Sequence, residues 1–380
     1  MPVLRAPRMP MAMERITVAE PQHGEVRVRM VASGVCHSCL HTADGSHTTA
    51  PLPIVLGDEG AGVVEQVGPG CTAVQPGDHV VLSWAPGCGR CRACRAGRPV
   101  ICRRTPPFGA LEDGTTRFRD GGGAAVHHYG PATYAPLAVV AERAAIPIRR
   151  DMPLETAALI GCSVTTGIGA VASRAEVDLG QSVAVFGCGG VGLNAVQGAV
   201  LVGADPVVAI DVVDERLAQA RRMGATLLID ARRCDPVTEV HRLLGVGVDH
   251  AIAAVGVTAV IEQAIASTAP GGTCVVVGNP PTGSSLEVSP HHILGGERQI
   301  VGCVYGSWDP ALAFPTLVGL YLAGRVQLDD LVTRRYALEE ANEAFDDLAA
   351  GRVARGLIVF PAPEAGGAQR SAHPPSTFST

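Results

Sequence analysis

Residues 182–199 read SVAVFGCGGVGLNAVQGA, and this stretch decides the fold. A short apolar run leads into Gly187, Gly189, Gly190, Val191 and Gly192, and a helix-forming segment follows. The spacing is G-x-G-x-x-G, which lets the backbone approach a pyrophosphate lying on a helix N-terminus. The stretch therefore predicts a strand, a dinucleotide-binding turn and a helix.

The sequence downstream of this turn repeats the alternation of strand and helix. Strands are predicted at 206–211, 226–230, 250–255 and 271–278, and helices at 191–203, 214–223 and 258–268. This βαβαβ order is typical of a parallel sheet with helices on both faces.

Asp211 ends the second of these strands, about 20 residues after the turn, where a carboxylate can accept hydrogen bonds from a ribose and repel a 2′-phosphate. This position favours NAD over NADP. Arg216, five residues further on, could also reach the adenosine ribose.

Upstream of the turn the pattern changes to short β-branched runs. Residues 25–35 alternate as a strand, and residues 54–82 contain runs broken by Gly, Pro and Asp, which predicts a small barrel-like β domain. Residues 86–130 are rich in Gly, Arg, Cys and Pro and are predicted as loop. After residue 305 we expect helices at 310–323 and 338–350 and a last strand at 356–360.

The long loop contains four cysteines, at spacings of two, two and seven intervening residues: Cys88, Cys91, Cys94 and Cys102. Thiolates this close in sequence can close on one tetrahedral ion, and four sulfurs leave no position for a substrate. The pattern predicts a structural zinc site that anchors the loop. An iron–sulfur cluster and a set of metal-free thiols are the alternatives.

A second group of chemically active residues precedes this loop. Cys36, Ser38 and His41 lie within six residues of one another, and Asp58 and Glu59 stand between glycines in GDEG. Thiols, carboxylates, a hydroxyl and a histidine together indicate a metal site with a path for a proton.

These motifs, in this order, resemble the zinc-dependent medium-chain alcohol dehydrogenase family over residues 20–362, closest to its class III-like and bacterial branch. The resemblance is strongest in SGVCHSCLH, LGDEGAGVVEQVG, LIGCSVTTGIGA and EEANEAFDDLAAGRVARGLIVF. It implies an α/β fold in which a GroES-like β-barrel catalytic domain (1–163 and 305–362) is split by a Rossmann domain with a doubly wound parallel sheet (164–304). The Pro-, Ala- and Ser-rich tail 363–380 is predicted to be disordered.

The resemblance also assigns a catalytic zinc site, and this sequence departs from the family there. The family uses Cys, His and Cys as ligands; Cys36 and Cys162 match the outer two, but the middle position is Asp58. The aspartate that orients that histidine in the family is replaced by Cys39. Glu59 matches a glutamate that can approach the metal.

Other positions are assigned by the same resemblance. Ser38 and His41 match the proton relay, His37 matches a pyrophosphate contact, and Arg355 matches an arginine near the cofactor phosphates. We also assign Val191 and Val277 to the coenzyme site. Trp84 and the segment 127–134 are expected to line the substrate pocket.

Three interpretations of the altered site follow. Zinc could be held by Cys36, Asp58 and Cys162, with water or Glu59 as fourth ligand; an aspartate is shorter than an imidazole, so reach is the difficulty. Cys39 could instead join Cys36 and Cys162 in a three-sulfur site. Alternatively the catalytic zinc is absent, and the enzyme reduces a conjugated C=C or an iminium C=N bond. A non-catalytic NAD-binding relative is a further alternative.

Composition limits the remaining choices. The 380 residues are 47% hydrophobic and 17% charged, with net charge −6 and no lysine. The sequence has no stripe of basic residues, so we expect no nucleic-acid partner. We also expect no membrane span and no signal peptide. These observations predict a cytoplasmic protein. The resemblance implies an NAD-dependent homodimer or homotetramer that interconverts an apolar alcohol and its aldehyde or ketone, with structural Zn²⁺ and a catalytic Zn²⁺ site.

Overall fold

The computed structural model describes residues 1–47, 50–103 and 108–361. Its six-stranded sheet is entirely parallel, with strand order β14-β13-β12-β15-β16-β17. Numbered from its own first strand, this is the order 3-2-1-4-5-6 of the doubly wound dinucleotide-binding fold. The strands are β12 (Val183–Phe186), β13 (Val207–Asp211), β14 (Leu227–Asp230), β15 (Val248–Ala253), β16 (Thr268–Val276) and β17 (Gln299–Gly302).

Helices cover both faces of this sheet because successive strand residues point to opposite sides. Val183 and Val185 pack with residues of α5 and α6, whereas Ala184 and Phe186 pack with residues of α7 and α8. The predicted parallel sheet with two helical layers is therefore confirmed. The helices are α5 (Gly190–Val202), α6 (Asp214–Arg222), α7 (Pro236–Leu244), α8 (Thr258–Ala266) and the short α9 (Pro290–Leu294).

The second large sheet is built around β4 (Glu25–Gly34), which pairs antiparallel with β6 on one side and with β10 and β19 on the other. The first half of β4 pairs with β10 and its last residues pair with β19, so the strand curves round the barrel-like core. Its other members are β6 (Gly60–Val67), β7 (His79–Leu82), β10 (Leu137–Ala141), β11 (Ala145–Pro147), β18 (Arg334–Tyr336) and β19 (Gly356–Val359).

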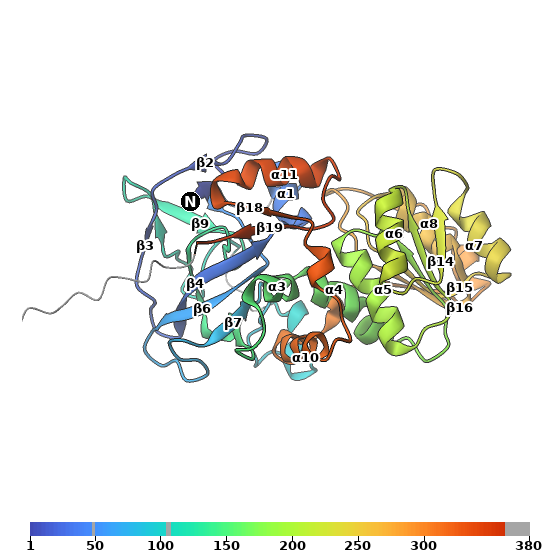
Figure 1. Ribbon diagram of the computed structural model, residues 1–380, viewed down its shortest axis with the longest axis horizontal. Coiled ribbons are helices and arrows are strands. Elements are labelled where there is room, and N and C mark those ends of the chain that lie inside the picture. Colours follow the sequence, from blue (N-terminus) through green and yellow to red (C-terminus); the bar gives the residue numbers. More distant parts are fainter. Residues whose placement is uncertain (48–49, 104–107, 362–380) are drawn as a thin grey trace, which may run out of the picture.

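Smaller elements complete this part of the molecule. They include the strands β1 (Pro2–Val3), β2 (Ala12–Met13), β3 (Thr17–Val18), β5 (Ile54–Val55), β8 (Phe118–Arg119) and β9 (Ala125–His128), and the helices α1 (His37–Ala43), α2 (Arg92–Arg95), α3 (Leu154–Ala158), α4 (Ser163–Gly169), α10 (Pro310–Leu322) and α11 (Ala341–Ala349). In Figure 1 the β4 sheet and the parallel sheet lie at opposite ends of the molecule, with α4 between them.

The contact between α4 and α5 joins the two halves. A Cβ atom on Gly167 would overlap the carbonyl oxygen of Val191, and one on Gly198 would lie 3.0 Å from the Cα of Ile168. The two helix backbones can approach this closely only because both positions are glycine. The middle of α4, which begins directly after Cys162, is thereby held against the first turns of α5.

The structure adds elements that the sequence pattern did not predict. They include α7, the edge strand β17, the helices between residues 154 and 175, and the short pieces α2, β8 and β9 inside the region predicted as loop. All strands of the parallel sheet fall within residues 164–304, and on this basis we propose the domain division stated above. The predicted disordered tail lies outside the described residues.

Membrane-spanning character was assessed for the same residues. No single helix among them has both the length and the hydropathy of a span; the pair Leu154–Gly161 and Ser163–Ala175, bent by 54°, meets the criterion by length and composition only.

Candidate active site

The glycine turn after β12 has the geometry needed to approach a phosphate. Gly187 has a φ of +91°, and a Cβ on Gly192 would overlap the carbonyl oxygen of Gly187. Gly189 caps α5, and Val191 lies in its first turn. No larger residue fits at Gly192, so the chain turns sharply and exposes the N–H groups at the start of α5.

Asp211 lies at the end of β13, next to this turn. Its carboxylate accepts hydrogen bonds from the backbone N–H groups of Cys188 (2.7 Å), Val212 (2.7 Å) and Val213 (2.9 Å). Arg216 Nη1 lies 3.9 Å from Asp211 Oδ1. Val277 follows β16, and its N–H donates to the carbonyl of Ala253 at the end of β15. The predicted coenzyme residues of the Rossmann half thus gather at the carboxyl ends of its strands.

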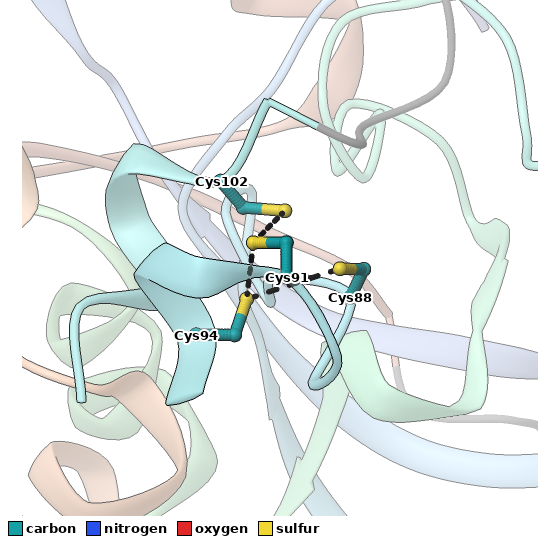
Figure 2. A group of neighbouring side chains, drawn as sticks. All are labelled: Cys88, Cys91, Cys94 and Cys102. Carbon is teal, nitrogen blue, oxygen red and sulfur yellow. Dashed lines mark hydrogen bonds between the residues drawn. The ribbon is translucent and has the colours of Figure 1, made fainter. Parts of the chain in front are cut away.

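The four-cysteine loop forms a compact sulfur cluster (Figure 2). Its Sγ–Sγ distances are 3.5 Å from Cys91 to Cys94, 3.7 Å from Cys91 to Cys102 and 4.0 Å from Cys88 to Cys94. A tetrahedral zinc with Zn–S bonds of about 2.3 Å requires sulfurs about 3.8 Å apart. The N–H of Arg90 is the main influence that lowers the pKa of Cys88 to about 6, so this thiolate forms readily. These three distances are close to the value that zinc requires, and all four sulfurs lie within 4.8 Å of one another, so the donor set fits zinc.

A second cluster forms where the two halves of the molecule meet. Cys36 precedes α1, Asp58 lies between β5 and β6, and Cys162 precedes α4. Cys36 Sγ lies 3.9 Å from Cys162 Sγ, which lies 3.8 Å from Asp58 Oδ2. Zinc bonds of about 2.3 Å to sulfur and 2.1 Å to oxygen require a sulfur–oxygen distance of about 3.6 Å. The shorter side chain of Asp58 therefore reaches the cluster.

The ionisation of this cluster indicates that it is built for a cation. The hydrogen bond from the Cys162 thiol lowers the pKa of Cys36, while the same contact raises the pKa of Cys162. Burial, followed by the charge on Cys36, raises the pKa of Asp58 well above its ordinary value. Three buried acids cannot all ionise together without a compensating positive charge, and a divalent cation provides one.

Cys39 and Glu59 lie outside this group of three donors. Cys39 Sγ lies 3.5 Å from Asp58 Oδ1, the oxygen that faces away from Cys162, and the thiol is fully buried. Glu59 is fully buried and forms an ion pair with Arg355; its Oε1 accepts a hydrogen bond from Ser163 at 3.1 Å. The donor atoms that lie close enough together to hold one metal ion are those of Cys36, Asp58 and Cys162, and neither Cys39 nor Glu59 is among them.

Arg355 connects the cluster to the coenzyme turn. Besides pairing with Glu59, its side chain lies beside Gly190, where an added Cβ would be 3.3 Å from Arg355 Cδ. The charge of Arg355 also contributes to the lowered pKa of Cys36. One guanidinium thus lies between the thiolate cluster and the helix N-terminus at which a pyrophosphate would bind.

The predicted proton-relay residues lie on α1. The backbone and the hydroxyl of Ser38 both help to lower the pKa of Cys36, and His41 follows one turn later on the same helix. The ring of His41 lies 6.1 Å from that of His37 and 5.1 Å from that of His47 (centroid distances). His41 therefore has two histidines near it, the exposed His37 and the half-buried His47.

Aromatic side chains form one wall beside the cluster, and the sequence pattern identified only part of it. The rings of Trp84 and Tyr305 stack with centroids 4.4 Å apart, and the backbone of Gly130 lies between Trp84 and Asp58. Burial raises the pKa of Tyr305, with a contribution from Cys162. No sequence motif surrounds Tyr305. It joins this wall through its contact with Trp84, which lies 221 positions away in the sequence.

Comparison with known proteins agrees with this geometry. Residues 22–150 match the alcohol dehydrogenase GroES-like domain, and residues 190–321 match the zinc-binding dehydrogenase family. The chain is 37% identical over 354 residues to a probable S-(hydroxymethyl)glutathione dehydrogenase 1 of Schizosaccharomyces pombe, covering 92% of this chain and 93% of the relative. It is 34% identical over 363 residues to the S-(hydroxymethyl)glutathione dehydrogenase of Paracoccus denitrificans, covering 92% and 96%.

Solved structures show the same similarity. An alcohol dehydrogenase zinc-binding domain protein from Burkholderia ambifaria superposes with a TM-score of 0.91 at 38% identity, covering 95% of this chain and 98% of the other. Benzyl alcohol dehydrogenase from Acinetobacter calcoaceticus gives 0.90 at 32% identity, with the same coverages. The chain therefore belongs to the zinc-dependent medium-chain alcohol dehydrogenase family, as an oxidoreductase with a GroES-like domain and a Rossmann domain.

Proposed function

We propose that this enzyme interconverts an apolar, preferably aromatic, alcohol and its aldehyde with NAD as coenzyme, at a zinc held by Cys36, Asp58 and Cys162. The observation that carries the proposal is the buried cluster of these three donors, which Arg355 links to the coenzyme turn by pairing with Glu59 and lying beside Gly190. When bound, zinc would stabilise charge on the substrate oxygen, and NAD would accept or donate the hydride.

The side chains around the cluster have separate tasks in this reaction. Asp58 and the two thiolates bind the metal, and Cys39 holds the far oxygen of Asp58. Ser38 is placed to take the proton of the substrate hydroxyl, and His41 to pass it on toward solvent. A histidine suits that step because its ordinary pKa of about 6.5 lies near neutrality.

The aromatic wall determines the proposed substrate class. Trp84 is 36% exposed although it stacks on the buried Tyr305, so part of its indole remains available to a ligand. An aromatic ring packed on an indole is worth about 0.5–1.5 kcal/mol beyond the area it buries. This wall favours a benzyl-type alcohol over ethanol.

The test is a substrate panel with metal analysis. Benzyl alcohol, ethanol and S-(hydroxymethyl)glutathione are offered with NAD and with NADP to wild type, Asp58→Ala and Trp84→Ala, and zinc per chain is measured for each. We expect Asp58→Ala to lose activity together with about one zinc per chain. Trp84→Ala should lower kcat/KM for benzyl alcohol by about tenfold, with little change for ethanol.

Three outcomes would contradict the proposal. Preference for the glutathione adduct would replace the aromatic substrate class. Full zinc content in Asp58→Ala would remove Asp58 from the ligand set. Activity toward conjugated C=C or C=N bonds by protein with only the four-cysteine zinc would favour the reductase alternative.

Asp211 is the basis for proposing NAD as the coenzyme. Its carboxylate lies at the ribose end of the turn and would repel a 2′-phosphate, although Arg216 at 3.9 Å reduces this repulsion. We expect wild type to show a lower KM for NAD than for NADP, and Asp211→Ala to reduce that difference. A location in the cytoplasm and assembly as a homodimer or homotetramer remain part of the proposal.

A further inference from the structure

We propose that the outer surface of the four-cysteine loop is a binding site for a small polyanion, meaning a ligand with several phosphate or carboxylate groups close together. A hollow of about 700 Å³ opens there, within the size range of small-molecule sites. Among the described residues its lining contains no acidic side chain and includes four arginines: Arg90, Arg92, Arg98 and Arg103.

These arginines are exposed, and in residues 1–47, 50–103 and 108–361 none of the four has an ion pair or a side-chain hydrogen bond. Arg143, behind the same loop, differs: its guanidinium bonds to the carbonyl of Gly87 and pairs with Glu112. Elsewhere paired arginines are common, as at Arg117 with Glu25. Four unpaired guanidiniums around one hollow repel one another, and a multivalent anion would relieve that repulsion.

The cluster is local rather than a consequence of overall charge, because the chain has a net charge of −6. Arginine forks bind phosphate and carboxylate oxygens in a bidentate manner, so four of them can hold a ligand with three or four negative charges. Ala93, Ala96 and Ile101 supply the apolar part of the lining, which leaves room for a small carbon skeleton on the ligand.

A competing explanation is that the arginines neutralise the zinc site itself. Four thiolates and one Zn²⁺ carry a charge of −2, and Cys91 also lines the hollow. However, among the described residues none of the four guanidiniums hydrogen-bonds to a cysteine sulfur, and the sulfurs contact one another instead. The arginines therefore remain available to a ligand from solvent.

The experiment measures binding of inorganic tripolyphosphate and of propane-1,2,3-tricarboxylate to zinc-loaded full-length protein by calorimetry, with sulfate as a single-anion control. The variants are Arg90→Gln/Arg98→Gln and the charge-conserving Arg90→Lys/Arg98→Lys. Arg149→Gln/Arg150→Gln is the matched control, since these exposed arginines already pair with Asp151 and Asp78. Coenzyme affinity and zinc content are measured for every protein.

We expect saturable binding of at least one polyanion, weakened about tenfold or more in the Gln variant and unchanged in the control. The Lys variant should lie between wild type and the Gln variant, because it keeps the charge but loses the fork. Tighter tripolyphosphate binding would identify a phosphate ligand, and tighter tricarboxylate binding a carboxylate ligand.

Other results would overturn the proposal. These are absence of saturable binding, equal weakening in the control, or binding as strong for sulfate as for the polyanions. Loss of about one zinc per chain in both the Gln and the Lys variants would show that the arginines serve the metal instead. Should the Gln variant fail to fold, Arg92→Gln alone gives the same comparison, with a smaller expected effect.

Discussion

The buried thiol of Cys39 determines which oxygen of Asp58 is free to bind a metal. It lies 3.5 Å from Oδ1, and this leaves Oδ2 facing Cys162. Groups that orient a ligand in this way are worth about 10–100-fold in metal affinity. Asp58 stands where the family has a histidine ligand, and Cys39 stands where the family has the aspartate that orients this ligand. We infer that the two replacements belong together, because Cys39 now orients Asp58.

Replacing Cys39 tests this role. We predict that Cys39→Ala weakens zinc binding at the Cys36 site about tenfold, because Asp58 loses its donor and can rotate. Cys39→Ser, which keeps a donor, should retain most of the affinity. The measurement is competition with a zinc chelator, followed by the absorption spectrum of the cobalt-substituted protein. Cys274→Ala, which removes a buried thiol from β16, is the control; equal affinity in Cys39→Ala and this control would exclude the role.

His250 makes stability depend on pH. It lies in β15, is 7% exposed, and its Nε2 lies 2.9 Å from Gln181 Oε1. Burial lowers its pKa, although Asp249 opposes the shift. Since the folded pKa lies below the ordinary value of about 6.5, the unfolded chain binds the proton more readily. The contribution to stability is complete above a pH of about 6.5 and is lost as pH falls through the folded pKa.

The prediction is that the free energy of unfolding falls between about pH 7.5 and about pH 5.5, and falls less in His250→Gln. Urea denaturation of both proteins at each pH gives the comparison. The control is His23→Gln, which changes an exposed histidine. A steeper pH dependence in His250→Gln than in wild type would contradict the expected direction.

The four-cysteine loop has almost no core of its own. It contains a four-residue helix, α2, and a single 3₁₀ turn, Pro99–Ile101, and Val100 is its one fully apolar contribution to the main core cluster among the described residues. A segment this poor in apolar contacts depends on its metal for order. A zinc ion held by the four cysteines would take the place of a hydrophobic core in residues 86–103.

We predict that Cys94→Ser lowers zinc content by about one ion per chain and speeds tryptic cleavage within 86–103 about tenfold. Cys234→Ser, a change at an exposed cysteine, should alter neither quantity. Metal analysis and peptide mapping provide the readouts. Retention of the full zinc content in Cys94→Ser would show that the sulfur cluster is not a zinc site.

Among the elements, those with strong periodicity were predictable and those that depend on neighbours were not. The turn after β12 and the strands β13 to β16 were predicted from the sequence. These strands are buried on both faces and therefore appear as nearly continuous apolar runs. β17 was missed because it is a short edge strand in which Gln299 and Ile300 are exposed. Inside the predicted loop, β8 and β9 have only two and four residues, too short for a periodic signal.

In the whole molecule, β17 is one of the two edge strands of the parallel sheet, β14 being the other. It pairs with β16 on one side, and no strand of the described chain pairs with its other side. Ile300 and Val304 are 37% and 45% exposed there. An exposed apolar edge strand is a template for pairing with another chain, so this edge is where we expect the second copy of a dimer to add.

Light scattering tests this assembly. We predict a native mass of twice the chain mass of 39.1 kDa, and a monomer mass for Ile300→Arg/Val304→Arg, because charges at the edge disfavour strand pairing. Leu179→Arg, at a residue that is 86% exposed, is the control and should leave the mass unchanged. A double variant that keeps the wild-type mass would place the interface elsewhere.

By itself the sequence determined the fold class, the coenzyme turn and the four-cysteine cluster, because each is specified by residues close together in the chain. Only the tertiary structure decided that Asp58 reaches Cys36 and Cys162, that Cys39 binds Asp58 rather than joining the ligands, and that Glu59 pairs with Arg355. Cys36 and Cys162 are separated by 126 residues. Contacts over such separations depend on how β4, β6 and α4 pack, and no local pattern encodes the distance between two side chains brought together in this way.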